Sequence, residues 1–423
     1  MIFRPLIGFK VSIMRDNSLK YALRKALVVT RTSTILDSVV EIDIGKRTDA
    51  FKGLTAPFNF PYLLTPSLYT LINAIPAMRQ LRTVQLNNIT LSRMYLRTIL
   101  SSPHLIQLIL NTVPLPKMST FPPTQLRKLT LTMMFSWETV QPLIAHLATS
   151  LDYLELRWCG FLPSSQVQLP PFPCLRELRY HQSYTQSTFP NKGQLNELLR
   201  LASHVTHLHV TGHLHNVPIT ACQESLQSLS ISTRMLSEHI LGTKPFPQLV
   251  HLSLLLFGFA DTADHRLTPS SFIRDHFPMI ISFQLYVPWE LRIHAMVIAR
   301  SQRKVQALKL VINIWEGTKE EEMTPYLPVE DPNEPLHRAT LPAVLQILNL
   351  EVIQSHDELK QSATWCSRWV FDDVVPSVTG LGGTGLKSIG LSASQAKSRS
   401  VKRERVLSRQ WVKAPDGDWQ RLE

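Results

Sequence analysis

Glycine and cysteine are both scarce in this chain of 423 residues, which contains 15 glycines and 4 cysteines. Four widely spaced thiols cannot form the dense disulfide framework of a small secreted domain. No stretch approaches the roughly 18 consecutive apolar residues that a membrane-spanning helix needs. The sequence also lacks the GxSxG, P-loop, HExxH, CxxC and GxGxxG motifs. We therefore expect no membrane association, no catalytic residues, no metal ion and no cofactor.

Two local clusters resemble ligand sites but have simpler interpretations. Gly380–Gly385 lacks the lysine and the strand–helix setting of a phosphate-binding loop, which favours a flexible connector. Five histidines lie between positions 204 and 215, and His207 and His209 would share one face of a strand. His181 on the preceding strand is a conceivable third metal ligand. Zinc sites normally need three or four ligands, so a polar groove lining is favoured.

Charge is distributed unevenly along the chain, with 44 basic and 32 acidic residues and a net charge of +12. The N-terminal lead, residues 1–38, and the C-terminal tail, residues 392–423, are both basic. The lead leaves open a mitochondrial transit peptide. In the tail, Lys402–Arg405 is either a nuclear import signal or part of a solvated surface. The acidic segment 316–334 reads as an exposed loop. We expect a cytoplasmic or nuclear protein.

Leucine is abundant, with 63 residues, and it repeats at a regular spacing. The strict pattern Leu-x-x-Leu-x-Leu should occur about once by chance at this composition. It begins instead at five positions: Leu105, Leu126, Leu151, Leu249 and Leu345. Looser matches fall between them, and the starts from Leu81 to Leu249 advance by 21 to 30 residues. Leucine-rich repeats have a period of about 20–29 residues.

This pattern predicts an α/β fold in the form of a leucine-rich repeat solenoid, or horseshoe, over residues 39–391. Each triplet reads as a short strand with alternating buried and exposed residues. The repeats are irregular, at about 21–31 residues, with longer C-terminal insertions. Helix-like apolar spacing occurs between the triplets, for example in segments 93–102, 139–148 and 194–202. Trp411 and Trp419, separated by a Pro-Asp-Gly turn, predict a short terminal hairpin.

Irregular repeats with proline-rich joins resemble the leucine-rich portion of fungal F-box proteins. The segment Leu96–Leu105, with the triplet that follows it, and the closing Trp411–Trp419 segment carry this resemblance. It implies that the repeats select a substrate, and that a three-helix F-box would dock onto a ubiquitin-ligase adaptor. The F-box signature, Leu-Pro followed by an acidic residue and an apolar helix, has no counterpart in residues 1–50. Adaptor binding is therefore not expected.

Residues that flank the inner leucines of each triplet would line the concave face of the solenoid. Charged and aromatic residues are most frequent at these positions in the middle of the chain. Such concave faces often bind other molecules, although an ordinary solvated sheet face has the same pattern. We expect a non-catalytic protein-recognition module; the alternative is a nuclear or nucleic-acid-associated protein that uses its basic ends. The predicted partner-binding residues are Tyr153, Glu155, Arg157, Glu177, Arg179, His181, His207 and His209.

Overall fold

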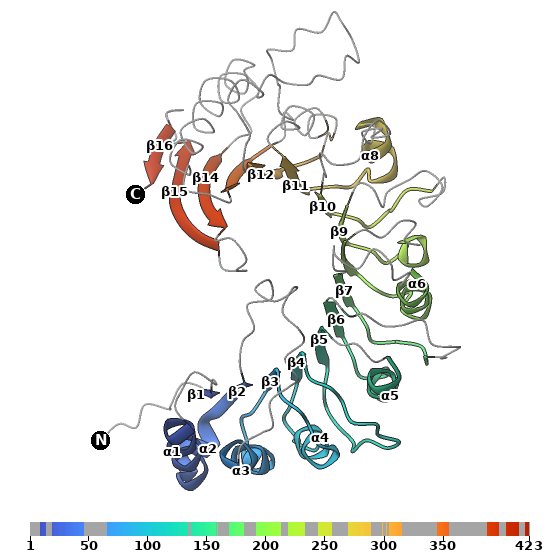
Figure 1. Ribbon diagram of the computed structural model, residues 1–423. Coiled ribbons are helices and arrows are strands. Elements are labelled where there is room, and N and C mark those ends of the chain that lie inside the picture. Colours follow the sequence, from blue (N-terminus) through green and yellow to red (C-terminus); the bar gives the residue numbers. More distant parts are fainter. Residues whose placement is uncertain are drawn as a thin grey trace, which may run out of the picture. The chain divides into compact units, whose positions relative to one another are not determined.

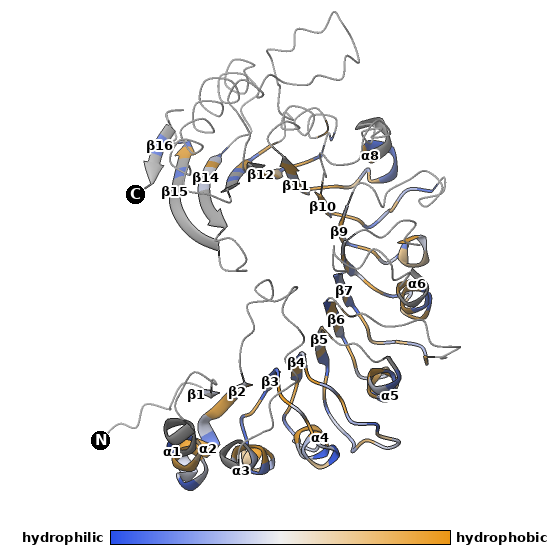
Figure 2. Ribbon diagram, viewed as in Figure 1, coloured by the Kyte–Doolittle hydropathy of each residue, from blue (hydrophilic) through white to orange (hydrophobic). Residues whose placement is uncertain are grey.

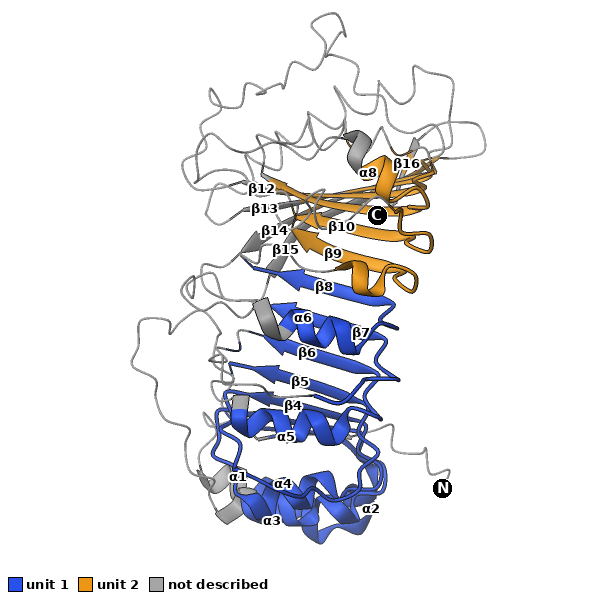
Figure 3. Ribbon diagram, turned by 90° about the vertical axis from the view of Figure 1, so that its right-hand side faces the viewer, with its two compact units in different colours: residues 1–217 blue, residues 218–423 orange. Residues whose placement is uncertain are grey.

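The computed structural model divides the chain into two compact units, Met1–Val217 and Pro218–Glu423 (Figure 3). Each unit is described by itself. The residues described are 9–13, 19–45, 66–133, 137–157, 159, 169–181, 192–212, 219–232, 244–255, 270–288, 298, 302, 304–314, 345–354, 387–396, 403–413 and 419–422.

The first unit contains a parallel sheet in which each strand pairs with the next strand along the chain (Figure 1). A single register places the inner leucines of successive triplets side by side. One column contains Leu108, Leu129 and Leu154, and all three side chains are fully buried. The strands are β1 (Phe9–Ile13), β2 (Val39–Gly45), β3 (Thr83–Asn87), β4 (Gln107–Asn111), β5 (Lys128–Thr132), β6 (Tyr153–Arg157), β7 (Glu177–His181) and β8 (His207–Thr211).

Helices connect several of these strands and cover one face of the sheet, whereas β4 and β5 are joined by a segment without a helix (Figure 1). Leu96, Ile99 and Leu100 form the buried side of α4, as expected for a helix with apolar residues three and four positions apart. Among the described residues, no helix lies on the opposite face (Figure 1). The helices are α1 (Leu19–Arg31), α2 (Ser33–Ser38), α3 (Pro66–Ala74), the 3-10 turn η1 (Ile75–Ala77), α4 (Arg93–Leu100), α5 (Trp137–Leu147) and α6 (Lys192–Leu201).

Several strands of the first unit end at a residue with positive φ, which turns the chain out of the sheet. Gly45 has φ of 108°, and Asn88, Thr112 and Met133 have φ between 51° and 55°. The amide of Met133 donates to the carbonyl of Arg157 at 2.8 Å, so the end of β5 is tied to the end of β6. These turns hold neighbouring strand ends in register.

In the second unit, too, each strand from β9 to β16 lies beside the next strand along the chain. Strands β9 to β14 are parallel, β15 is antiparallel to β14, and β16 is antiparallel to β15, with Lys413 paired with Trp419. The elements are η2 (Ile219–Cys222), β9 (Ser228–Ser232), β10 (His251–Leu255), α8 (Ser270–His276), β11 (Ser282–Pro288), β12 (Ala307–Ile314), β13 (Ile347–Gln354), β14 (Ser388–Ala396), β15 (Arg403–Lys413) and β16 (Trp419–Leu422).

Each unit has its core between the sheet and the connecting segments. Figure 2 shows hydrophobic residues along the strands and on the helix faces that meet them. In the second unit Phe246 and Phe277 pack with ring centroids 5.3 Å apart, and both are fully buried. Leu252 and Phe283 pair across β10 and β11 in the same core.

The expected α/β class is confirmed, since each unit has a mostly parallel sheet that does not close into a barrel. Each of the five strict triplets overlaps a strand, and the predicted helical segments at 93–102, 139–148 and 194–202 overlap α4, α5 and α6. Helices α5 and α6 each begin two residues before the predicted segment.

Two predicted boundaries of the solenoid, residues 39 and 391, do not coincide with the ends of strands. Strand β1 lies inside the predicted lead, and β14 runs five residues past position 391 to Ala396. The acidic segment 316–334 and Gly380–Gly385 lie outside the described residues. In the part of the chain that is described, no helix is both long enough and apolar enough to cross a membrane.

Candidate functional site

The register of the first unit brings all eight predicted binding residues onto three adjacent strands, β6, β7 and β8. Across these strands Tyr153 pairs with Glu177, and Glu177 pairs with His207. The next rows are Glu155–Arg179–His209 and Arg157–His181–Thr211. Alternate residues of a strand share a face, so these side chains lie on the face opposite the buried leucines. We call this set of eight residues the central patch.

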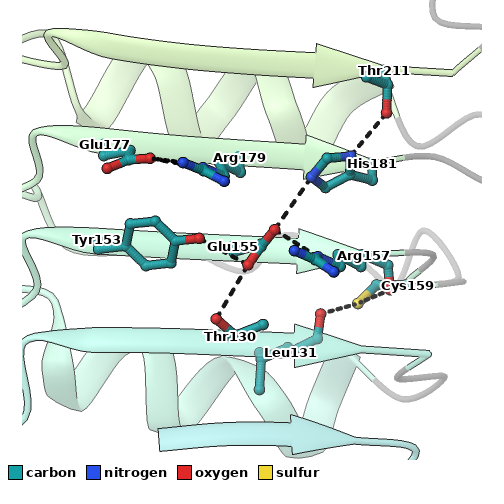
Figure 4. A network of polar contacts seen from close by, with 10 residues as sticks. All are labelled: Thr130, Leu131, Tyr153, Glu155, Arg157, Cys159, Glu177, Arg179, His181 and Thr211. Atoms are coloured by element: carbon teal, nitrogen blue, oxygen red, sulfur yellow. Dashed lines mark hydrogen bonds and ion pairs between the residues drawn. The ribbon is translucent and has the colours of Figure 1, made fainter. Parts of the chain in front are cut away.

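Glu155 is the centre of a hydrogen-bond network in the central patch (Figure 4). Its Oε2 accepts from the hydroxyls of Tyr153, at 2.8 Å, and Thr130, at 3.3 Å. Its Oε1 accepts from Nε of Arg157 at 2.6 Å. Nε2 of His181 lies 3.3 Å from the same oxygen, without the alignment of a hydrogen bond. Four side chains from three strands therefore converge on one carboxylate.

The carboxylate of Glu155 is held in its charged form. Burial alone would raise its pKa, but the contacts with His181, Arg157 and Tyr153 outweigh burial and lower the pKa to about 2. The residue is only 3% exposed. Glu155 is one of the predicted partner-binding residues, and in the structure its buried carboxylate holds Tyr153 and Arg157 in place.

Arg179 is fixed by two neighbours at the surface of the central patch. Its Nε and Nη2 lie 2.7 and 2.6 Å from Oε1 of Glu177. Its guanidinium carbon lies 5.6 Å from the centre of the Tyr153 ring, within the range of a cation–π interaction. The side chains of Arg179 and Arg157 remain 44% and 42% exposed. Both guanidiniums are therefore oriented by the protein and accessible to a partner.

The three histidines of the central patch occupy different environments. Nδ1 of His181 lies 2.9 Å from the hydroxyl of Thr211, and its ring centroid lies 4.8 Å from that of His209. Burial, followed by the nearby His181 and Arg179, lowers the pKa of His209 to about 4. His209 is therefore neutral at physiological pH. His207 is exposed and contacts the hydroxyl of Thr206 at 2.8 Å.

The histidine pattern does not produce a metal site in the described part of the chain. Among those residues, no group of three or more His, Cys, Asp or Glu side chains could hold a metal ion. His213 and His215 lie outside the described residues.

The basic run Lys402–Arg405 lies at the start of a strand. Its residues 403–405 belong to β15 and pair with β14.

The predicted set of binding residues leaves out two features of this region. The first is the contribution of Thr130 and Thr211, which complete the network from β5 and β8 (Figure 4). The second is a hollow of about 680 Å³ in the first unit, which we call the rim hollow. Its lining residues are Gln125, Arg127, Thr149, Ser150, Asp152, Pro173, Cys174 and Arg176.

A sequence signal for the rim hollow was present. Arg127, Asp152 and Arg176 each occupy the first variable position of a Leu-x-x-Leu triplet, directly before β5, β6 and β7. Charged residues at one repeated position in three successive triplets predict a cluster at the edge of the sheet.

Comparison with known proteins gives no assignment for this arrangement. The chain matches no protein-family model and no curated protein sequence.

Proposed function

We propose that this chain is a leucine-rich repeat module that binds a protein through the central patch and performs no catalysis. The coincidence of the leucine triplets with parallel strands supports the repeat assignment. So do the helices that connect several of these strands on one face of the first unit, such as α4 between β3 and β4 and α5 between β5 and β6. One strand with its helix cannot enclose a core, whereas stacked copies can.

The observation that carries the binding proposal is the fixed geometry of Tyr153, Arg157 and Arg179 around buried Glu155. Tyrosine and arginine are enriched among residues that dominate the energy of protein interfaces. Side chains that are already oriented lose less conformational entropy on binding. The central patch thus has both the residue types and the rigidity of an interface centre.

The exposed groups of the central patch suggest the chemistry of its partner. Each guanidinium has five N–H donors, and Glu155 and Glu177 occupy only some of those of Arg157 and Arg179. The ring of Tyr153 adds apolar area. We expect a protein surface that presents carboxylate or carbonyl oxygens beside an apolar group.

The resemblance to the repeats of fungal F-box proteins supports a role in substrate selection. We propose only this recognition of a substrate. Residues 19–38 form α1 and α2, which connect the parallel strands β1 and β2. This part of the chain belongs to the sheet unit, and we do not propose that it binds a ligase adaptor.

Paired double variants test the proposal. Tyr153→Ala with Arg179→Glu should abolish capture of the partners found with the wild-type chain, because it removes the aromatic surface and reverses a charge. Ser228→Ala with Ser230→Ala, on β9, changes two small strand residues and should retain those partners. Quantitative affinity capture measures both, and thermal unfolding verifies that each variant is folded. Equal capture by the two variants would show that the central patch is not the binding surface.

The alternative, nucleic-acid binding, rests on the net charge of +12 and the basic ends of the chain. Binding through phosphates weakens steeply as salt rises. A filter-binding titration with single-stranded RNA and duplex DNA at 50 and 200 mM salt distinguishes nucleic-acid binding from protein binding. Tight, salt-sensitive binding that survives the Tyr153→Ala and Arg179→Glu changes would favour the alternative.

A further inference from the structure

The rim hollow lies at the edge of the first unit where β5, β6 and β7 begin. Arg127, Asp152 and Arg176 immediately precede these strands. The carbonyl of Arg127 accepts from the amide of Asp152 at 2.9 Å, and the carbonyl of Asp152 accepts from the amide of Arg176 at 3.0 Å. The backbone therefore fixes the three residues side by side, with Asp152 in the middle.

The charged side chains of the rim hollow are not used by the rest of the described structure. Arg127 and Arg176 are exposed, and neither side chain forms a hydrogen bond or ion pair with any described residue. Oδ1 of Asp152 is shielded from water and has no hydrogen-bond partner in the described part of the chain. The hydroxyl of Ser150, in contrast, is occupied by the carbonyls of Leu126 and Leu147.

These groups define the chemistry of a ligand. Two guanidiniums are suited to an anion with paired oxygens, because their N–H groups form a rigid fork. Asp152 lines the hollow between the two arginines, and a carboxylate accepts hydrogen bonds from a ligand N–H. Two arginines and one aspartate leave a net charge of +1 among the lining residues. This favours a singly charged carboxylate over a doubly charged phosphate.

We propose that the rim hollow binds the C-terminal residue of a peptide. In this assignment Arg127 and Arg176 bind the terminal carboxylate, and Asp152 accepts the N–H of the same residue. A chain terminus carries both groups within one residue. The site is separate from the central patch, because Asp152 and Arg176 alternate with Tyr153 and Glu177, which face the patch.

Fluorescence anisotropy with a defined peptide pool tests the assignment on the full chain. The pool consists of labelled hexapeptides with three randomised C-terminal positions, prepared both as free acids and as C-terminal amides. We expect the free acids to bind about tenfold or more tightly than the amides, since a charge-assisted pair is lost in the amide. Arg127→Gln and Arg176→Gln should each abolish this difference, and Asp152→Asn should weaken binding of the free acids.

Lys128→Gln is the matched control, because it removes one positive charge from the residue next to Arg127, on the strand itself. It should leave the preference for free acids unchanged. The variant Tyr153→Ala with Arg179→Glu should also leave it unchanged, which separates this site from the proposed function.

Three results would overturn the assignment. The first is equal binding of acids and amides, including no binding of either. The second is an unchanged preference in the Arg127→Gln and Arg176→Gln variants. The third is full competition by inorganic phosphate at the concentration of the peptide pool, which would indicate a general anion site.

Discussion

Nε of Arg157 lies 2.6 Å from Oε1 of Glu155, two positions earlier on the same strand. Residues two apart on a strand share a face, so β6 supplies both members of this ion pair. The pair orients an exposed guanidinium with a buried carboxylate. The consequences of this arrangement can be measured.

Glu155→Gln should destabilise the first unit by about 1–3 kcal/mol at pH 7, because it replaces a charged acceptor of several hydrogen bonds. The pKa of Glu155 is lowered from 4.5 to about 2, so its charge stabilises the folded state above pH 4.5. That contribution is lost as the pH falls towards 2. Urea unfolding of both proteins from pH 7 to pH 2 should show their difference in stability shrinking across this range.

Glu177→Gln is the control for this measurement. Glu177 pairs with Arg179 at a partly exposed position, where ion pairs contribute about 0–1 kcal/mol. A larger effect at Glu177 than at Glu155 would contradict the central role assigned to Glu155.

Leu154→Ala should destabilise the fold by about 2–5 kcal/mol, as should Leu129→Ala, because each removes a fully buried side chain from the core. Met94, which is 58% exposed on α4, provides the control, and Met94→Ala should change stability by less than about 0.5 kcal/mol. Denaturant midpoints measure all three. Midpoints near the wild-type value for both leucine variants would be incompatible with the buried leucine columns.

Gly45→Ala should be strongly destabilising for a backbone reason. Gly45 has φ of 108°, and an added Cβ would lie 1.9 Å from the carbonyl oxygen of Asn87. The substitution therefore forces β2 and β3 apart as well as straining the turn. We expect a cost above about 1–3 kcal/mol, the usual range for a strained backbone position alone. Gly212→Ala, at φ of 118°, serves as the comparison.

The chain should not bind a ubiquitin-ligase adaptor at one-to-one stoichiometry. The N-terminal helices α1 and α2 join β1 to β2, and α1 packs against α3. A reconstituted pull-down with purified adaptor tests this expectation. Stoichiometric capture would mean that these helices form an adaptor-binding surface that the sequence does not reveal.

The strands were predictable because the leucine triplets carry their own signal. Period-two alternation identifies the buried face, and a constant spacing places one triplet beside the next. Tyr153, Glu177 and His207 could therefore be assigned to neighbouring strands from the sequence alone. Strand β1, in contrast, contains no leucine triplet, so it read as part of a basic lead.

The burial of Glu155 could not be read from the sequence. A glutamate between two leucines normally indicates an exposed strand position. Its environment depends on Thr130, 25 positions earlier, and on His181, 26 positions later. The same applies to the rim hollow, whose residues come together only when β5, β6 and β7 are aligned. The pattern of residue types along one strand does not reveal such contacts between strands.

The order of strands also determines how this protein responds to mechanical force. Within the described residues of the first unit, each strand pairs only with the strands before and after it in the sequence. Tension applied along the chain therefore loads a terminal strand first, and its loss leaves the remaining pairs intact. Stretched from its ends in an optical trap, the unit should lengthen in successive small steps, each releasing about one strand and its connecting segment.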